Sequence, residues 1–562
     1  MTTLHGLGVG RGGVVGPVWQ TRAAVQVPVD APLLVAGVPA DTATTCTCVD
    51  QAFADVADGL RAQAEQASGA LADMLAANAQ IAADAALRAR VRARITAGDP
   101  PVAAVDGAVS VFAARFEQAG GRVAERVADL RAVRDRVVAA VFGLSVPVPG
   151  LERPSVVVAG DLAPADAAAL DLEHVLALVT ERGGPTSHTA VVAGQLGIPC
   201  LVQVAGATDL ADGVVVAVDA AAGTLTVDPD DAVRARLDAR TQADQALAAD
   251  ASPGATADGR PVPLLVNVGS VVDAERAAAA DMEGVGLFRT EVLYLNRTTA
   301  PTLAEQTAVY TRLLRTLAGR TVVVRTLDVG TDKPLPFTAP DAAENPALGV
   351  RGYRLVRTHP ELFGTQLAAL AAAARATGTA PWVMAPMVTT ADEARDVATA
   401  VRAAGLPTAG VMVEVPAAAL RAEQILAEVD FCSVGTNDLA QYTMATSREL
   451  GALADLLSPW QPAVLDLVAT TAQAGVRTGK PVGVCGESAA DPVMALVLVG
   501  LGVTSLSMAP SAVPVVRYAL RRHPLARCRD LAEAALAARS APEARAAALA
   551  LVDPTVRAAL GW

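Results

Sequence analysis

The chain has 562 residues, which is too long for one ordinary hydrophobic core and indicates two to four domains. Its composition, 52% hydrophobic and 18% charged, is that of a globular protein, and much of the apolar content is alanine. The formal net charge of −13, from 45 basic and 58 acidic residues, argues against a broad nucleic-acid-binding surface, which needs clustered lysine and arginine.

The first residues are rich in glycine and alternate like a strand, and they lack the charged start and apolar core of a secretory signal. Residues 8–13, GVGRGG, formally fit the G-x-G-x-x-G pattern of dinucleotide sites. No proper strand precedes this segment and no helix with a correctly spaced acidic residue follows it, so we interpret it as a flexible turn. A P-loop nucleotide site is also unsupported, because no G-x-x-x-x-G-K-[ST] sequence occurs.

The first half of the chain predicts one domain inserted into another. Residues 21–144 are rich in alanine, arginine and glutamate, with apolar residues at helical spacing, and predict a helical bundle. Short strands alternate with helix over 145–229, and this part is expected to share an α/β domain with residues 1–20. A charged helical stretch and the small, turn-forming segment ASPGATADGRP then predict a linker over 230–261.

The second half predicts a closed (β/α)8 barrel over residues 262–562. Eight short apolar segments alternate with helical stretches there: 264–268, 286–288, 322–327, 382–387, 410–414, 431–434, 482–485 and 505–508. The alternative is an open doubly wound sheet, which would need a glycine fingerprint at the first strand–helix turn. That fingerprint is absent.

Two features bear on the compartment. The stretch Pro492–Val516 carries no charged residue, but it contains Pro510, Pro514, Gly500 and Gly502, so it predicts a buried helix followed by a strand rather than a membrane span. The six cysteines are scattered, without metal-ligand spacing, and indicate the reduced thiols of a cytoplasmic protein.

Polar residues recur at the ends of the predicted barrel strands, which should form one rim. Glu414 and Asp438 follow consecutive strands and are candidate ligands of a divalent cation such as Mg²⁺, which prefers oxygen ligands. Salt bridging of these carboxylates is the alternative. Cys485 also ends a strand, where it can be either a buried structural thiol or a proton donor.

Several cations lie near the same predicted rim. These are Arg289, Arg325, Arg351, Arg448 and Lys333. The fork geometry of guanidinium groups matches phosphate and carboxylate oxygens, so the group predicts a site for an anionic substrate. Structural ion pairing with the acidic surplus is the alternative for any single arginine.

His188 lies in the segment GGPTSHTAVV, and the chain has only five histidines. The two glycines permit close backbone approach, and Thr186, Ser187 and Thr189 supply hydroxyl groups. The residues that follow are expected to form a helix, whose N-terminus favours an anion beside the imidazole ring. This setting predicts a nucleophile that accepts a phosphoryl group.

Seven segments, in order along nearly the whole chain, resemble the Enzyme I family of the bacterial sugar phosphotransferase system. They are GGPTSHTAVVAGQLGIP, GLFRTEVLY, RTLDVGTDKP, ENPALGVRGYR, GVMVEVPAAAL, DFCSVGTNDLAQYTMA and GVCGESAADP. The resemblance implies that phosphoenolpyruvate phosphorylates Nε2 of His188, which then charges the small phosphocarrier protein HPr. It also implies Mg²⁺ on Glu414 and Asp438, docking of HPr on the helical domain, and a homodimer formed through the barrel.

The resemblance assigns further roles. Arg289, Arg325, Asn437 and Arg448 match family positions that hold substrate, and Cys485 matches the group that protonates the enolate carbon of pyruvate. Because one histidine must serve both the barrel and an external partner, we expect the domain around residues 155–228 to swivel about the connector near 230–262.

The chain departs from the family pattern at four positions. Ala163 stands where threonine is frequent, Gly194 and Pro185 stand where arginine is frequent, and Thr331 replaces a usual glycine. Two alternatives follow for the function. One is a catalytically silent regulatory homologue, and the other is an enzyme like pyruvate phosphate dikinase or phosphoenolpyruvate synthase, which would need an additional nucleotide-binding domain.

Overall fold

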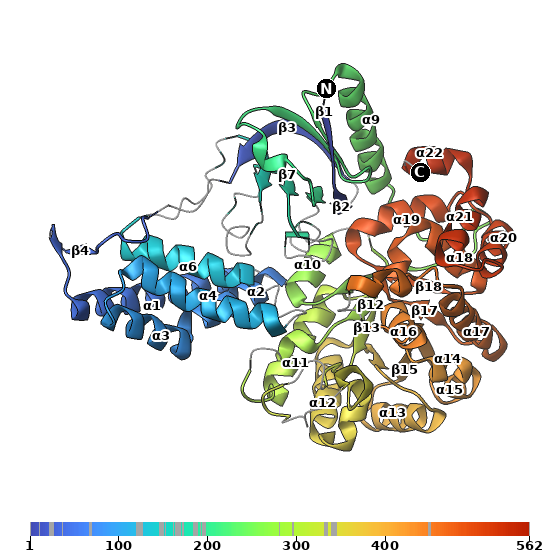
Figure 1. Cartoon of the computed structure of the whole chain (residues 1–562). Helices are drawn as coiled ribbons and strands as arrows, with labels where there is room; N and C mark the ends of the chain where they lie inside the picture. The colour runs from blue at the N-terminus through green and yellow to red at the C-terminus, as the bar shows by residue number, and fades with distance from the viewer. Residues whose placement is uncertain are drawn as a thin grey trace. The chain divides into compact units, whose positions relative to one another are not determined.

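The computed structural model describes residues 2–9, 12–21, 27–35, 37–66, 70–119, 127–144, 151, 153–160, 162, 170, 174–183, 189–190, 193, 198–279, 282–294, 297–330, 335–338, 345–447 and 451–560. The chain forms two compact units, Met1–Ala243 and Asp244–Trp562 (Figure 1).

The first unit contains an eight-stranded sheet in the order β1-β10-β9-β3-β6-β7-β8-β2. Its N-terminal strands pair with strands that follow the helical region: β3 runs parallel to β6 and antiparallel to β9. The continuous valine run of β6 is buried along its whole length, as expected for a strand covered on both faces. The strands are β1 (Thr2–His5), β2 (Leu7–Val9), β3 (Gly13–Gln20), β6 (Ser155–Ala159), β7 (Val175–Thr180), β8 (Cys200–Val202), β9 (Val215–Asp219) and β10 (Thr224–Val227).

Helices occupy the region between β3 and β6, as the helical spacing predicted. Leu87, Val91 and Ile95 form one buried stripe of α3, and the carboxylate of Asp84 caps that helix by accepting from the Leu87 N–H. The helices are α1 (Thr42–Gln66), α2 (Ala70–Ala83), α3 (Ala85–Thr96), α4 (Pro101–Ala119) and α6 (Val127–Val141), preceded by a small hairpin of β4 (Leu34–Val35) and β5 (Val38–Pro39). Helix α9 (Asp231–Ala248) forms the first part of the predicted linker, residues 230–261.

The second unit is a closed barrel of eight parallel strands, so the predicted fold class is confirmed. All eight predicted segments are strands, although some end earlier than predicted. The fourth ends at Ala385 because Pro386 has no N–H to donate and Met387 adopts a left-handed backbone with φ of 59°. The strands are β11 (Leu264–Val268), β12 (Gly284–Phe288), β13 (Thr321–Arg325), β14 (Trp382–Ala385), β15 (Thr408–Val413), β16 (Phe431–Val434), β17 (Val482–Val484) and β18 (Ser505–Met508).

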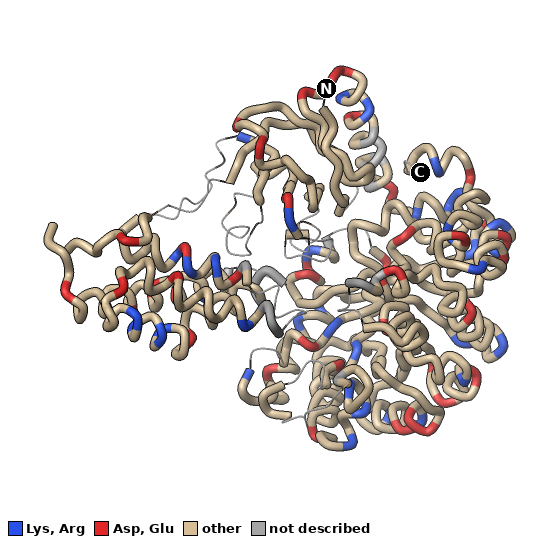
Figure 2. Tube along the Cα trace, in the orientation of Figure 1, with Lys and Arg blue, Asp and Glu red and all other residues tan. Residues whose placement is uncertain are grey.

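Helices surround this barrel (Figure 1). Several begin at proline and end before glycine, as α12 and α17 do, because proline fits the first helical turn and glycine adopts the left-handed cap. Acidic and basic residues both occur along the outer helices (Figure 2). The helices are α10 (Val271–Ala279), α11 (Leu303–Thr316), α12 (Pro360–Thr377), α13 (Ala391–Ala403), α14 (Pro416–Leu420), α15 (Ala422–Glu428), α16 (Thr436–Thr443), α17 (Pro462–Thr478), α18 (Pro492–Leu501), α19 (Val513–Leu520), α20 (Leu525–Leu536), α21 (Ala541–Leu551) and α22 (Pro554–Leu560).

The charge-free stretch forms the buried helix α18 followed by strand β18, as predicted. A Cβ atom on Gly500 would lie 2.0 Å from the carbonyl oxygen of Cys528, so glycine is what lets α18 approach α20 so closely. Among the residues that the structure describes, no helix is both long enough and apolar enough to cross a bilayer.

His523 joins the turn after α19 to the end of α21. Its side chain is 1% exposed; Nδ1 lies 2.8 Å from the Ala519 carbonyl, and Nε2 accepts from the Asp553 N–H at 3.0 Å. Burial lowers the pKa of this imidazole below its usual value, while the nearby Asp553 opposes the shift and Arg527 adds to it. The folded barrel therefore holds His523 neutral.

We expect this histidine to make the barrel less stable in mild acid. The unfolded chain binds the proton at a higher pH than the folded chain, so the stabilisation is complete above about pH 6.5 and is lost as the pH falls below it. Urea unfolding followed by circular dichroism between pH 7.5 and 5 should show this decline, and His523→Gln should have a shallower slope. Equal slopes in the two proteins would contradict the assignment.

Candidate active site

The ends of the barrel strands bring four of the predicted site residues to one mouth. Arg325 is the last residue of β13, Glu414 directly follows β15, Asp438 lies in the first turn of α16 after β16, and Cys485 directly follows β17. All eight strands are parallel, so these ends lie on the same side of the barrel.

Arg325 is only 8% exposed and is held by two carboxylates. Its Nη2 lies 3.0 Å from Oε1 of Glu291, and its Nη1 lies 3.1 Å from Oδ2 of Asp328. Burial disfavours the charged guanidinium, but Glu291, Asp328 and Glu414 outweigh that effect and raise the pKa of Arg325. The group is therefore a fixed positive charge in a dry setting.

Arg351 connects two strand ends. Its Nε and Nη2 donate to the two carboxylate oxygens of Asp328 at 3.2 Å each, and its Nη1 donates to Oδ1 of Asp438 at 3.1 Å. The same Nη1 lies 3.4 Å from the hydroxyl of Tyr442, which donates to the Ala347 carbonyl at 2.6 Å. The fork contact orients the guanidinium plane, so Arg351 fixes the spacing between Asp328 and Asp438.

Glu414 is completely buried and has one oxygen without a partner. Its Oε1 accepts from the Met387 N–H at 2.6 Å, whereas Oε2 has no hydrogen-bond partner in the described part of the chain. Burial, followed by repulsion from Asp438 and Asp328, raises the pKa of Glu414 to about 8, although Arg325 and Arg351 partly offset this. The nearby arginines therefore do not supply enough positive charge to keep the Glu414 carboxyl ionised at its usual pKa.

Two backbone features shape the space around Glu414. Met387 has a φ of 59°, which is unusual for a side chain of this size and costs about 1–3 kcal/mol, and it aims its N–H at Glu414. A Cβ atom on Gly435 would lie 2.9 Å from Oε2 of Glu414, so a larger residue at this position would crowd that oxygen.

The charge balance of the buried mouth is negative. Four carboxylates, those of Glu291, Asp328, Glu414 and Asp438, face two buried guanidiniums. Within the described residues, no three His, Cys, Asp or Glu side chains come close enough together to hold a metal ion by themselves. The orphaned oxygen of Glu414 and the negative excess nevertheless fit a divalent cation that takes two protein carboxylates and completes its shell with water or substrate oxygens.

The thiol of Cys485 faces the inside of the barrel. It is 4% exposed, packs with Leu287, Met384 and Met412, and its Sγ lies 3.8 Å from the Val434 carbonyl oxygen. Burial raises the pKa of this thiol, so it keeps its proton at neutral pH. The side chain can therefore donate a proton but is a poor thiolate nucleophile.

The two remaining described candidates lie at the edge of the mouth. Arg289 follows β12 with an exposed side chain, and its backbone N–H donates to the Val268 carbonyl at 2.9 Å. Asn437 is half-buried, and its side-chain oxygen accepts from the Glu487 N–H at 3.3 Å. Both follow their strands as predicted, but neither shares the buried ion-pair network.

Several predicted positions lie outside the described residues. These are His188, Lys333 and Arg448, together with the departures from the family pattern at Ala163, Pro185, Gly194 and Thr331. Their roles stay predictions.

Sequence reasoning missed Glu291 and Tyr442 as members of the site. Glu291 lies in the first turn after β12, two residues beyond Arg289, and Tyr442 is one turn after Asp438 in α16. The strand-end rule could have found Glu291, because it directs attention to the whole loop after each strand.

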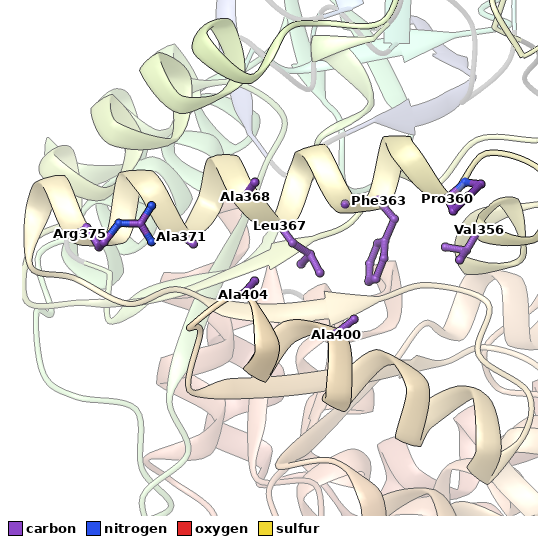
Figure 3. A pocket seen from close by; sticks show the side chains of 10 residues that line it. Val356, Pro360, Phe363, Leu367, Ala368, Ala371, Arg375, Ala400 and Ala404 are labelled. Carbon is purple, nitrogen blue, oxygen red and sulfur yellow. The ribbon is translucent and has the colours of Figure 1, made fainter.

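A separate hollow of about 470 Å³ lies on the outside of the barrel, between α12 and α13. Figure 3 shows Phe363 and Leu367 of α12 directed toward Ala400 and Ala404, with Arg375 as the charged residue at one end. Its apolar lining cannot bind a multiply charged substrate, so the strand ends, and not this hollow, form the candidate active site.

Comparison with known families agrees with this assignment. Three family models match in chain order, described as "PEP-utilising enzyme, N-terminal" over residues 5–126, "PEP-utilising enzyme, mobile domain" over 151–223 and "PEP-utilising enzyme, PEP-binding domain" over 243–525. The last of these contains every described candidate residue of the barrel mouth.

Curated relatives cover three quarters or more of the chain. The phosphoenolpyruvate-protein phosphotransferase of Streptomyces coelicolor is 47% identical over 556 residues, which are 98% of this chain and 99% of that protein. Proteins of the same name from Haloferax volcanii and Geobacillus stearothermophilus are 42% and 38% identical, over 79% and 75% of this chain and 80% and 76% of their own lengths. The predicted enzyme class is confirmed, and the chain belongs to the phosphoenolpyruvate–protein phosphotransferase family of PEP-utilising enzymes.

Proposed function

We propose that the chain transfers the phosphoryl group of phosphoenolpyruvate to its own His188 and then to a histidine of the phosphocarrier protein HPr, releasing pyruvate. The observation that carries this proposal is the convergence of Arg325, Arg351, Glu414 and Asp438 at one buried mouth within the segment matched by the PEP-binding family model. Fixed guanidiniums stabilise the charge of a transferring phosphoryl group, which supplies most of the catalysis in such reactions.

Glu414 and Asp438 would hold Mg²⁺ at this mouth. Support comes from the unpartnered Oε2 of Glu414 and from the raised pKa of its carboxyl, which together indicate missing positive charge. When bound, the ion would neutralise oxygens of the substrate's carboxylate and phosphate groups. Arg289, Arg325, Arg351 and Asn437, with Lys333 and Arg448, would hold the substrate around it.

The proposed chemistry balances with two groups of the chain. A bond forms between Nε2 of His188 and phosphorus while the bond between phosphorus and the enol oxygen breaks, leaving the enolate of pyruvate. The methylene carbon of the enolate then takes the proton of the Cys485 thiol, and solvent returns a proton to the thiolate. Burial suits Cys485 to this donor role, because a raised pKa keeps the thiol protonated until the enolate forms.

The remaining proposals concern organisation and partners. We propose a phosphohistidine domain of residues 1–20 and 145–229, a helical HPr-binding domain of 21–144, a linker over 230–261 and a barrel over 262–562 that forms a homodimer. The pairing of β3 with β6 and β9 supports the first of these, because it joins the N-terminal strands to the later ones. All six cysteines are free thiols, which supports a cytoplasmic location.

We expect phosphoenolpyruvate and Mg²⁺ to place acid-labile phosphate on the wild-type chain and none on His188→Ala. Intact-mass spectrometry measures this, and added HPr should remove the phosphate from the wild type. His5→Ala is the matched control, because His5 is an exposed histidine on β1 and its variant should label normally. Labelling that survives His188→Ala, or a wild type that never labels, contradicts the proposal.

The metal assignment predicts weaker Mn²⁺ binding by Glu414→Gln, with Mn²⁺ used as a spectroscopic probe for Mg²⁺. The substitution removes one ligand charge while keeping the acceptor for the Met387 N–H, so affinity should fall at least about tenfold in a paramagnetic-resonance titration. Glu423→Gln is the control, since this exposed carboxylate pairs with Arg477 on the surface. Equal Mn²⁺ affinity in wild type and Glu414→Gln would show that the ion lies elsewhere.

The proton-donor role predicts that Cys485→Ala slows pyruvate formation by about 10²- to 10⁴-fold. A coupled assay of pyruvate release measures this loss. Cys432→Ala is the matched control, because Cys432 is an equally buried thiol on the neighbouring strand β16 that packs in the outer hydrophobic core. Near-normal pyruvate release by Cys485→Ala would remove the thiol from the mechanism.

A further inference from the structure

We propose that Glu291 is a positioning residue, which orients the two buried arginines of the mouth without touching the substrate; this inference rests on the proposed function. Glu291 opens the 3₁₀ turn Glu291–Leu293 after β12, and its side chain is 12% exposed. A single oxygen, Oε1, accepts from Nη2 of Arg325 and from the backbone N–H of Asp328, each at 3.0 Å.

These two contacts reach both guanidiniums. The first fixes one arm of Arg325 directly. The second holds the backbone of Asp328 in place. The carboxylate of Asp328 in turn pairs with Nη1 of Arg325 at 3.1 Å and accepts from Nε and Nη2 of Arg351 at 3.2 Å each. Movement of Glu291 would therefore displace Arg325 directly and Arg351 through Asp328.

The loop after β13 is anchored at a second point beside the first. The backbone N–H of Leu327 donates to Oε1 of Gln366 at 3.0 Å, and Nε2 of Gln366 donates to the Tyr310 hydroxyl at 3.0 Å. Gln366 and Tyr310 are completely buried, so this anchor belongs to the packed wall of the barrel. Gln366 holds the loop with neutral bonds, whereas Glu291 adds the charge that pairs with Arg325.

This arrangement separates two functions of the Glu291 carboxylate. Glu291→Gln keeps an oxygen that can accept from the Asp328 N–H but removes the ion pair with Arg325. Glu291→Ala removes both contacts. Glu275→Ala is the control, because Glu275 is a surface carboxylate that pairs with Arg312 on the outside of the barrel at 2.7 Å.

The first test measures hydrogen exchange of the segment 322–330 in the protein without substrate. We expect exchange in this segment to be about ten- to a hundredfold faster in Glu291→Ala, because a hydrogen bond to a charged acceptor is lost. Glu291→Gln and Glu275→Ala should exchange like wild type. Unchanged exchange in Glu291→Ala would overturn the proposal whether or not the chain is phosphorylated.

The second test is a double-mutant cycle on the rate of phosphorylation by phosphoenolpyruvate. Glu291→Ala should lower kcat/KM about 10- to 100-fold in the wild-type background, since small misplacements of a charged group at a reacting centre cost that much. In the Arg325→Lys background, which lacks the guanidinium that Glu291 orients directly, the same change should cost several-fold less than in the wild-type background, because only the effect on Arg351 through Asp328 remains. Glu291→Gln should fall between wild type and Glu291→Ala.

The cycle distinguishes positioning from a general effect on folding. A misfolded fraction would lower the rate by the same factor in both backgrounds, so equal losses would overturn the proposal. A wild type that phosphoenolpyruvate does not phosphorylate would instead contradict the proposed function, and the exchange test would still decide the role of Glu291.

Discussion

The mouth of the barrel depends on one shared carboxylate. Asp328 is 2% exposed and receives both Arg325 and Arg351, so a single buried anion holds two buried cations. Moving charged groups out of water costs several kcal/mol per ion, and removing one partner of such a pair costs about 3–5 kcal/mol. Two further carboxylates stabilise these cations: Glu291 pairs with Nη2 of Arg325, and Asp438 pairs with Nη1 of Arg351. The result is a rigid ion-pair network, or charged lattice, anchored at the ends of β12, β13 and β16.

A rigid lattice suits phosphoryl transfer, because preorganised charges need no reorientation as the reaction proceeds. The closed barrel makes this possible. Its parallel strands project their ends to one side, and the packed helices outside it hold those ends in place. The exposed ion pairs of the outer helices, such as Arg395 with Glu428, contribute little by comparison, since water screens them.

The sequence allowed the barrel to be predicted because the strands are short, mostly apolar and largely buried runs that alternate with helical stretches. Errors were confined to strand ends, as at Met387, where a left-handed backbone cannot be foreseen from a methionine. Arg325, Glu414, Asp438 and Cys485 were predictable because parallel topology alone places strand ends together. Which carboxylate pairs with which arginine in the mouth was not predictable from the sequence.

Pairing within the mouth depends on loop geometry that no spacing rule contains. Arg351 follows β13 by a long connection, yet it reaches back to Asp328 and across to Asp438. Glu291 contacts Arg325 from a different loop, at 3.0 Å. The sequence predicted that the arginines together form a site for an anionic substrate. In the described mouth, both buried arginines instead pair with carboxylates of the chain itself.

That pairing changes the electrostatic problem of binding a substrate. An anion approaching the mouth meets guanidiniums whose charge is already shared among Glu291, Asp328 and Asp438, with Glu414 adding further repulsion. Repulsion between these carboxylates and the anionic groups of a substrate opposes the hydrogen bonds that the arginines can offer. The same deficit of positive charge, together with the unpartnered Oε2 of Glu414, is what supports the proposed divalent cation at this mouth.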